Sequence, residues 1–489
     1  MADKLSITTG ARNWYIGYTG VVALSVFLAI ITRQPLLLGA PFAVLLTFQT
    51  IVDFRAIYFL LLACIPISIE YYFPGGLGTD LPTEPLIIGL MLVYFLYALG
   101  KSDSDQAAFF RHPIMLVLFL HLGWTIVSVV NASVFLVSIK FFLAKIWYVV
   151  VFVFMTGLII RTVKDFKKLF WWIFIPLILA VLFTLFRQYL NGFSFELVHD
   201  SMKPMFRNHV NYAALLTLFA PFIFWARTWY EKGSTIRWIL NISLFIFVIA
   251  IYLSYTRAAY VALVIAFGSY LVFKFRVVKY VLALSVAGLI VGVAYMVHDN
   301  NYLEFAPDYN KAITHHQFDD LLEATYNFED ISTMERAYRW VAAGHMVRDG
   351  WLTGFGPGNF YNSYAPYTVK RFLTYVSDNP ERSGIHNYYF MVLVDQGLPG
   401  FLIFLGLVFI ILIVGERVYN NTEDKERQSI IMAVLMSSIA IYTFLIINDL
   451  IETDKVGAFF FINMAVLVNM DLLNRKKSEV KPANLPEAK

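Results

Sequence analysis

The sequence has little cysteine and little charge. Its 489 residues include one cysteine, Cys64, which excludes an intramolecular disulfide and a cysteine-based zinc or iron–sulfur site. Charged residues make up 15% of the chain and apolar residues 59%, with a mean hydropathy of +0.65. A soluble domain is about half apolar and about a quarter charged. We therefore expect an integral membrane protein with many spans.

Long apolar runs recur along the chain, and runs of roughly 17–25 residues are long enough to cross a bilayer as helices. The first meets Arg33-Gln34-Pro35 rather than a small-residue cleavage site, so we interpret it as a retained span. The sequence predicts an all-α polytopic membrane protein with about fourteen transmembrane helices, at about 14–32, 35–52, 56–73, 85–100, 113–130, 134–160, 168–187, 209–228, 238–255, 258–273, 279–297, 388–415, 429–448 and 456–473.

Lysine and arginine gather in alternate connections between these runs, whereas the connections 74–84 and 131–133 have none. Basic residues favour the cytoplasmic side of a membrane. The pattern predicts that both termini are cytoplasmic, with the basic tail 474–489 disordered near anionic lipid.

One polar stretch, about 298–387, is much longer than the other connections, and the charge pattern places it outside the membrane. Long loops are commonly functional. We expect it to be partly helical, with a surface helix at 333–348. The chain then divides into N-terminal transmembrane helices (1–204), core transmembrane helices (205–297), this large outer loop (298–387), C-terminal transmembrane helices (388–473) and a cytoplasmic tail (474–489).

A few cations fall on the outer side, against the general trend of the chain. They are Arg187, Arg207, Arg257, Arg336 and His386. Charged residues at a membrane boundary are expensive and commonly functional. An anionic ligand on the outer side explains why they gather there.

Four sequence patterns carry a family resemblance. His386-Asn387 is followed by nine residues and then Gly397-Leu398-Pro399-Gly400. Upstream lie Arg336 and Trp340, a glycine-rich run from Gly354 to Phe360, and Ser254 with Arg257. The segment Asn208-His209-Val210-Asn211-Tyr212-Ala213-Ala214 is rich in asparagine. Together, over about residues 205–415, these patterns resemble the O-antigen ligase superfamily.

That superfamily includes lipopolysaccharide O-antigen ligases, O-antigen polymerases and protein O-oligosaccharyltransferases. The resemblance implies a GT-C-type, metal-independent glycosyltransferase that uses a lipid-linked glycan and inverts the anomeric carbon. It also implies a central catalytic role for His386. The glycine and proline residues at 397–400 are expected to kink or break the helix that follows His386.

The residue types suit that chemistry. A glycan leaving a polyprenyl diphosphate leaves negative charge behind, and fixed donors that stabilise developing charge usually contribute most to catalysis. Arginine is always charged and binds phosphate oxygens with two N–H groups. A histidine near neutral pKa is a suitable proton acceptor. We therefore predict His386, Arg257 and Arg336 as catalytic residues.

Further residues are candidates for binding the diphosphate or glycan: Arg207, Arg339, Arg187, Lys145 and Asn387. Each has an ordinary alternative, such as an interfacial cation or a solvated ion pair on a surface helix. No metal site and no cofactor are expected. The only Asp-x-Asp pair, Asp103 and Asp105, is on the cytoplasmic side, and His315-His316 near Asp319-Asp320 is better interpreted as a polar loop.

The function predicted from sequence is transfer of a glycan en bloc from undecaprenyl diphosphate to lipid A–core, by a ligase at the periplasmic face of a bacterial inner membrane. The expected partners are the lipid-linked donor, the acceptor and membrane lipids, with no nucleic acid. An O-antigen or exopolysaccharide polymerase and a protein O-oligosaccharyltransferase remain open as alternatives. A polysaccharide transporter fits less well, because the chain shows no paired halves with broken helices.

Overall fold

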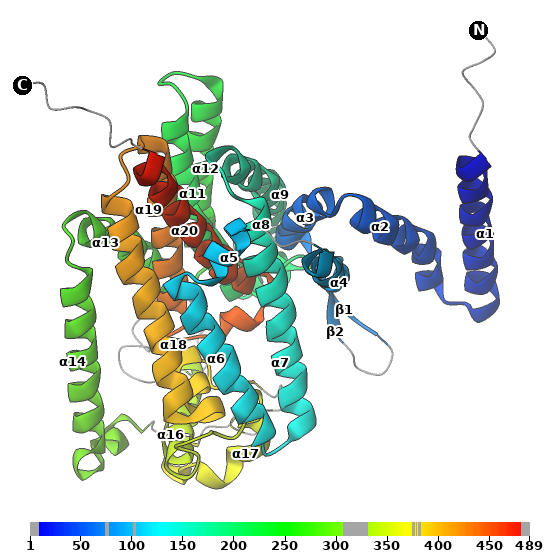
Figure 1. The fold of residues 1–489 in the computed structure, drawn as a ribbon. Helices are drawn as coiled ribbons and strands as arrows, with labels where there is room; N and C mark the ends of the chain where they lie inside the picture. The colour runs from blue at the N-terminus through cyan, green and yellow to red at the C-terminus, as the bar shows by residue number, and fades with distance from the viewer. Residues whose placement is uncertain are drawn as a thin grey trace, which may run out of the picture.

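A computed structural model describes residues 9–73, 78–100, 104–306, 331–373, 377, 379 and 383–480, and this part of the chain is almost entirely helical (Figure 1). The all-α prediction is confirmed. The described strands form one antiparallel hairpin, in which Ile69 pairs with Leu81. The helices and strands are α1 (Thr9–Thr32), η1 (Pro35–Gly39), α2 (Ala40–Val52), α3 (Phe54–Cys64), η2 (Ile65–Ile67), β1 (Ile69–Tyr72), β2 (Gly78–Leu81), α4 (Thr83–Gly100), α5 (Ser104–Phe110), α6 (Pro113–Val130), α7 (Phe135–Val149), η3 (Val150–Met155), α8 (Thr156–Ile159), α9 (Val163–Leu190), α10 (Val198–Met202), α11 (His209–Ala226), η4 (Arg227–Trp229), α12 (Thr235–Tyr252), α13 (Arg257–Lys274), α14 (Val278–Val297), η5 (His298–Phe305), α16 (Ile331–Asp349), α17 (Phe360–Ser363), η6 (Ala365–Tyr367), η7 (Lys370–Phe372), α18 (Tyr388–Asn420), α19 (Lys425–Phe444), η8 (Leu450–Glu452) and α20 (Asp454–Val480).

Within the described residues, eleven helices are long and apolar enough to cross a membrane. Three further apolar helices, Leu37–Val52, Phe54–Ile67 and Thr83–Leu99, are shorter. These three helices fall where the sequence predicts the second, third and fourth spans. The count of fourteen spans includes them, so it stays a prediction. The predicted span 56–73 ends early, because residues 69–72 leave the helix and pair with 78–81.

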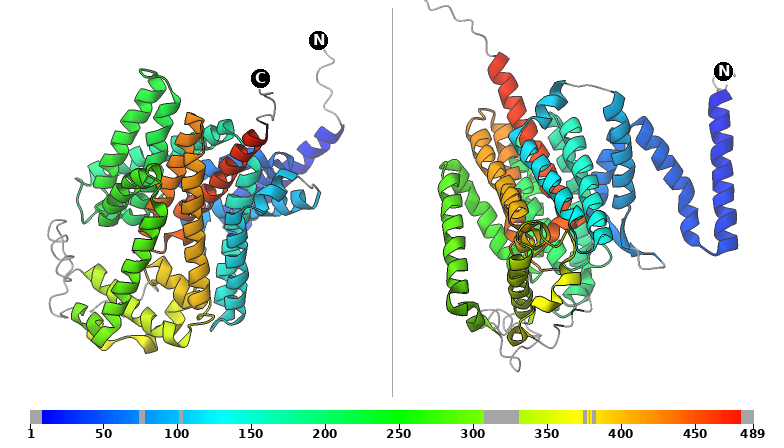
Figure 2. Two further views of the ribbon diagram at one scale, coloured as in Figure 1. Left: turned by 60° about the vertical axis from the view of Figure 1, so that its left-hand side comes forward. Right: turned by 60° about the horizontal axis from the view of Figure 1, so that its bottom comes forward.

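The helices α11, α19 and α20 form the centre of the bundle, and most of their residues are buried inside the protein. Helix α14 lies at the periphery, and α1 and α2 extend away from the bundle (Figure 2). Large apolar side chains on α14, such as Leu284 and Val291, are exposed. Exposed apolar helix faces of this kind are expected where lipid is the surrounding solvent.

The long polar stretch folds at one end of the bundle, where α16 and α17 lie opposite the C-terminus (Figure 1). The helix predicted at 333–348 corresponds to α16. The stretch has a small apolar core of its own, which includes Tyr338, Ala342, Met346 and Phe372. The segment with His315-His316 and Asp319-Asp320 lies outside the described residues.

The glycine-rich run from Gly354 to Phe360, within this polar stretch, packs against α18. Inside α18, Gly397 has a φ of 67° and a ψ of −175°, which interrupts the helix. The sequence-based prediction of a break at 397–400 is therefore confirmed. The N–H of Phe355 donates to the carbonyl of Val394 (2.9 Å), and that of Leu398 donates to the carbonyl of Trp351 (2.7 Å).

The glycines of this loop are needed because its backbone lies very close to neighbouring segments. Gly354 has a φ of +71°, and a Cβ there would lie 2.3 Å from the Asp395 carbonyl carbon. From the tip between α6 and α7, the Ser133 N–H donates to the Phe355 carbonyl (3.0 Å), and in the first turn of α7 the Ser138 hydroxyl donates to the Pro357 carbonyl (2.9 Å). The loop therefore fills the space between α18 and the tip of α6–α7.

At the opposite end, helix α20 continues to Val480, beyond the predicted limit of 473. The tail predicted as disordered from residue 474 is therefore helical over its first residues. The Asp471 carboxylate accepts hydrogen bonds from His112 (3.1 Å), Arg417 (3.1 Å) and Arg475 (2.7 Å), which fix this part of α20.

Candidate active site at the exit of the polar stretch

The segment that leads into α18 is held in place by α16. The Arg339 guanidinium donates to the Gly384 carbonyl (3.3 Å), and the Trp340 indole N–H donates to the Ile385 carbonyl (3.1 Å). His386 follows with a φ of +55°, a left-handed conformation that histidine tolerates better than most residues. The side chain of His386 is 31% exposed, so it is within reach of a ligand.

His386 faces an acidic residue from another part of the chain. Its Nδ1 lies 4.0 Å from Oδ1 of Asp449, in the connection between α19 and α20. The backbone nearby supports this approach, because the Tyr388 N–H donates to the Leu445 carbonyl (2.8 Å). Gly384 is also required here, since a Cβ at that position would lie 2.7 Å from Asp449 Oδ2. Among the residues that the structure describes, His386 Nδ1 has no hydrogen-bond partner, and its distance to Asp449 is longer than a hydrogen bond.

Three of the predicted cations act on this pair. Burial raises the pKa of Asp449 above its ordinary value, and the charges of Arg207, Arg339 and Arg336 partly offset that rise. The pKa of His386 is lowered to about 4, mainly by burial and further by the charges of Arg336 and Arg339, while Glu335 opposes the change. The imidazole is therefore neutral at physiological pH and able to accept a proton.

Arg336 and Arg339 are one helical turn apart but in different settings. Arg339 is buried and pairs with Glu335 (3.3 Å), whose other oxygen accepts a hydrogen bond from Ser377 (2.7 Å). Arg336 is less buried and donates to the Ser332 hydroxyl (2.7 Å) on the same helix. A buried, paired arginine is suited to fixing α16, whereas Arg336 is better placed to turn toward a ligand.

Arg207 is the most exposed of the three cations. Its side chain is 66% exposed, and Nε lies 3.9 Å from Glu70 Oε2 on the β1–β2 hairpin. A loose pair of this kind contributes little to stability. Arg207 can exchange Glu70 for an anionic ligand at little cost.

The structure places Arg187 away from this group, where its guanidinium donates to the backbone carbonyls of Lys203 and Asp200 and so ties down the 188–208 connection. Arg257 begins α13 and is half-buried. Next to it, the Thr256 hydroxyl donates to the His209 carbonyl (3.4 Å), which joins the Arg257 turn to the segment that follows Arg207.

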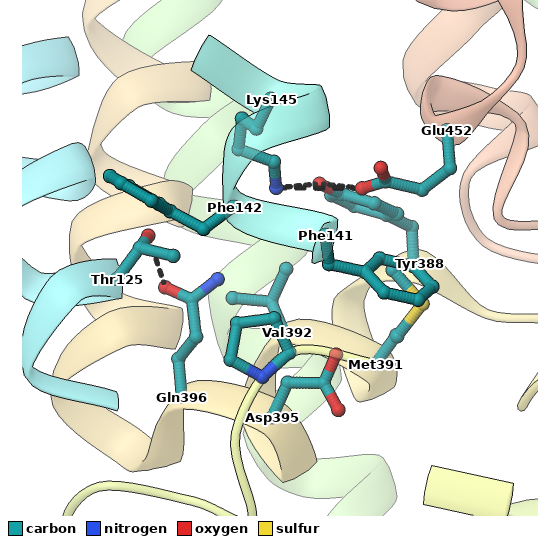
Figure 3. Close-up of a pocket in the computed structure, with 11 residues that line it drawn as sticks. Thr125, Phe141, Phe142, Lys145, Tyr388, Met391, Val392, Asp395, Gln396 and Glu452 are labelled. Carbon is teal, nitrogen blue, oxygen red and sulfur yellow. Dashed lines mark hydrogen bonds and ion pairs between the residues drawn. The ribbon is translucent and has the colours of Figure 1, made fainter. Parts of the chain in front are cut away.

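Lys145 lies in a neighbouring pocket (Figure 3). Its ammonium donates to the Tyr388 hydroxyl (3.0 Å) and lies 3.4 Å from Glu452. Asn387 caps α18, because its side-chain oxygen accepts the Phe390 N–H (3.0 Å). The described contact of Asn387 is thus with the protein backbone.

Sequence reasoning missed the acidic members of the site, Asp449, Glu452 and Asp395. The sequence does contain a pattern that could have indicated Asp449 and Glu452. They lie in the short connection after residue 448, which the charge pattern puts on the same side as His386. Across the described part of the chain, no group of three histidine, cysteine or acidic side chains is arranged to hold a metal ion.

By its fold, the chain is a polytopic membrane protein. At one end of its helix bundle it carries His386 together with Arg207, Arg336 and Arg339. The family model described as O-Antigen ligase matches residues 242–405, from within α12 to within α18. The matched region contains Arg257, Arg336 and His386, and it supports membership of the chain in the O-antigen ligase superfamily of glycosyltransferase-like ligases and polymerases. No curated protein matches the chain.

Proposed function

We propose that the protein transfers a glycan en bloc from undecaprenyl diphosphate to lipid A–core, as an O-antigen ligase. The observation that carries the proposal is the approach of His386 Nδ1 to Asp449 Oδ1 (4.0 Å), at a place where the charges of Arg336 and Arg207 influence the pair. We further propose that this end of the bundle faces the periplasm. The basic connections and both termini are then cytoplasmic.

In the proposed reaction, a hydroxyl of the acceptor attacks the anomeric carbon of the donor glycan. The new glycosidic C–O bond forms as the bond to the diphosphate oxygen breaks, and the electron pair leaves with the diphosphate. The hydroxyl proton passes to the neutral His386 imidazole. A single displacement of this kind inverts the anomeric carbon.

Asp449 orients the imidazole and stabilises the imidazolium that forms. The distance of 4.0 Å is longer than a hydrogen bond. Catalytic hydrogen bonds are often long without substrate and tighten in the reacting complex. A positive charge on His386 lies next to the Asp449 carboxylate and is therefore stabilised by it.

The arginines stabilise the leaving group. Arg207 and Arg336 carry positive charge: Arg207 lies 3.9 Å from Glu70 and is 66% exposed, and Arg336 donates to the Ser332 hydroxyl on its own helix. Charge-assisted hydrogen bonds from arginine to phosphate are among the strongest in proteins. Fixed positive charge at the diphosphate then replaces the role that a divalent metal has in many glycosyltransferases, and we propose a metal-independent reaction.

The proposal is tested by reconstituting the purified full-length protein with a polyprenyl-diphosphate-linked glycan. Lipid A–core, a second lipid-linked glycan and an acceptor protein are supplied in separate reactions. Glycan-capped lipid A–core is the expected product. Lengthened lipid-linked glycan with no capped lipid A–core contradicts the ligase assignment, and no transfer to any acceptor contradicts the glycosyltransferase proposal.

A further inference from the structure

Lys145 is a buried cation that the proposed reaction does not use. It lies in α7, and its side chain is 12% exposed. Its ammonium donates to the Tyr388 hydroxyl (3.0 Å) and lies 3.4 Å from Oε1 of Glu452. The Tyr388 hydroxyl donates to the same Glu452 oxygen (3.2 Å), so the three side chains form a closed triangle (Figure 3).

The triangle joins the two segments that carry the His386–Asp449 pair. Tyr388 follows His386 by two residues, and Glu452 follows Asp449 by three. The Glu452 N–H donates to the Asp449 carbonyl (3.3 Å), and the Tyr388 N–H donates to the Leu445 carbonyl (2.8 Å). Because these links are short, a movement of Glu452 relative to Tyr388 also changes the distance between His386 and Asp449.

Helix α7 provides a fixed position from which Lys145 can act. Two turns before it, the Ser138 hydroxyl accepts a hydrogen bond from the Asn359 side chain (2.8 Å), which ties α7 to the glycine-rich run. Three residues after it, Tyr148 packs against the start of α20, where a Cβ on Gly457 would lie 3.3 Å from the tyrosine ring. The lysine therefore lies between two close contacts of its helix.

The surroundings of Lys145 leave no room for a diphosphate or a sugar ring. The cavity beside the ammonium holds about one water molecule. Its charge is already balanced by Glu452. A buried ion pair seldom stabilises a fold more than apolar side chains of similar size, but it can fix one arrangement of the segments that it joins. This setting favours a role in positioning over the substrate contact predicted from the sequence.

We propose that Lys145 is a positioning residue, which clamps Tyr388 to Glu452 and so holds His386 and Asp449 at the separation that proton transfer requires. The inference rests on the proposed transferase function and deepens it. Lys145 touches no substrate in this arrangement. It acts through the pair, and its removal lets the two segments move apart.

The approach of the two segments can be measured without relying on transfer. Gly384→Cys and Asp449→Cys are combined in a Cys64→Ala background, which has no other thiol. A Cβ at position 384 would lie 3.9 Å from Cγ of Asp449, which is close enough for a disulfide. The Asp449 oxygen that crowds position 384 is absent from this protein. The rate of disulfide formation in a glutathione buffer therefore reports the approach.

Lys145→Met is compared with His112→Gln in this background. His112 is buried and pairs with Asp471 (3.1 Å) at the opposite end of the bundle, so it controls for the general effect of a broken buried pair. We expect Lys145→Met to slow disulfide formation about tenfold, because the two segments are no longer held together. We expect His112→Gln to leave the rate unchanged.

A second variant covers the case in which Lys145→Met does not reach the membrane. Lys145→Met combined with Glu452→Gln removes both charges, so no buried charge is left without its counter-ion. The clamp is lost in this protein as well. The same slowing of disulfide formation is expected.

A double-mutant cycle on the transfer reaction shows whether Lys145 acts through Asp449. Lys145→Met alone is expected to lower kcat about 10–100-fold, with little change in KM for the donor. In an Asp449→Asn background it should lower kcat only about twofold, because the carboxylate that it positions is already gone. His112→Gln is expected to change kcat by the same factor in both backgrounds.

Equal rates of disulfide formation with and without Lys145→Met overturn the proposal. A fall in kcat of the same size in both backgrounds also overturns it, since that result indicates a general structural role. A rise in KM for the donor without a fall in kcat identifies Lys145 as a substrate contact instead. Because disulfide formation requires no transfer, a wild-type protein that transfers no glycan contradicts the proposed function and leaves the clamp to be decided by the disulfide rates.

Discussion

The imidazole of His386 and the carboxylate of Asp449 approach to 4.0 Å, although two long helices, α18 and α19, separate them in the sequence. Each residue is held by its own neighbours. Side chains of α16 donate to backbone carbonyls of the segment before His386, and the connection 445–453 carries Asp449. The pair therefore depends on three separate parts of the chain.

Removal of the His386 imidazole is expected to reduce the rate of transfer by about 10²–10⁴-fold, the range for a general base. His386→Asn is the informative variant, because asparagine tolerates the left-handed backbone at this position better than alanine does. Initial rates of purified protein give the measurement. His386→Ala should be equally inactive, with protein levels in the membrane near normal. Loss of either variant from the membrane would favour a structural role instead.

The pH profile is expected to reflect the low pKa of His386. The neutral imidazole is the active form, so kcat/KM should fall only when the pH drops toward about 4, well below the ordinary value of 6.5. Arg336 disfavours the imidazolium, so Arg336→Gln should raise the pKa and move this acid limb to higher pH. Normalised kcat/KM profiles of the two proteins provide the comparison. An unshifted limb would show that Arg336 does not act on His386.

Asp449→Asn is expected to lower kcat with little change in KM for either substrate, because the carboxylate stabilises an imidazolium that forms only during reaction. Asparagine keeps the size of the side chain and its approach to Gly384. Steady-state kinetics and a thermal unfolding curve are measured together. A large rise in KM without a fall in kcat would place Asp449 in substrate binding rather than in orientation of His386.

Arg207 and Arg187 form a matched pair of variants. Arg207→Gln is expected to raise KM for the lipid-linked donor by roughly 10–100-fold, because a charge-assisted contact to the diphosphate is lost. Arg187→Gln is expected to leave donor KM unchanged and to lower stability by about 1 kcal/mol, since its guanidinium holds backbone carbonyls of the 188–208 connection. Equal effects of the two variants on the KM for the donor would show that Arg207 does not bind the diphosphate.

Chelation is expected to leave the transfer rate unchanged, because arginines stabilise the leaving diphosphate in the proposed reaction. The test compares initial rates with and without EDTA, followed by addition of Mg²⁺ or Mn²⁺. Activity that EDTA abolishes and a divalent ion restores would contradict the metal-independent reaction.

The helices and helix breaks that depend on neighbouring residues in the sequence could be predicted from it. Glycine and proline near 397–400 predicted the break in α18, and the surface helix predicted at 333–348 matches α16 to within two residues at each end. The strand at 69–72 was missed because Ile69, Tyr71 and Tyr72 continue the preceding apolar run, although Glu70 interrupts it and Pro74-Gly75-Gly76 signals a turn.

Long-range contacts were not predictable in the same way. Nothing near His386 in the sequence indicates that Asp449 will face it, since their approach depends on how α18, α19 and α20 pack. Likewise, Asp395 lies in a mostly apolar helix, where its contact with Gly358 follows only from the fold of the glycine-rich loop.

The glycine-rich loop also imposes an order of assembly. Residues 355–358 bond to the tip of α6–α7, which is synthesised long before them, and to the carbonyls of Val394 and Asp395, which are synthesised after them. The loop cannot reach its final shape until α18 has emerged, and His386 gains its acidic neighbour only when the connection before α20 is in place. A nascent chain therefore carries no complete site until the connection between α19 and α20 has emerged, and a chain truncated after α18 would retain every predicted cation yet lack the carboxylate that orients the base.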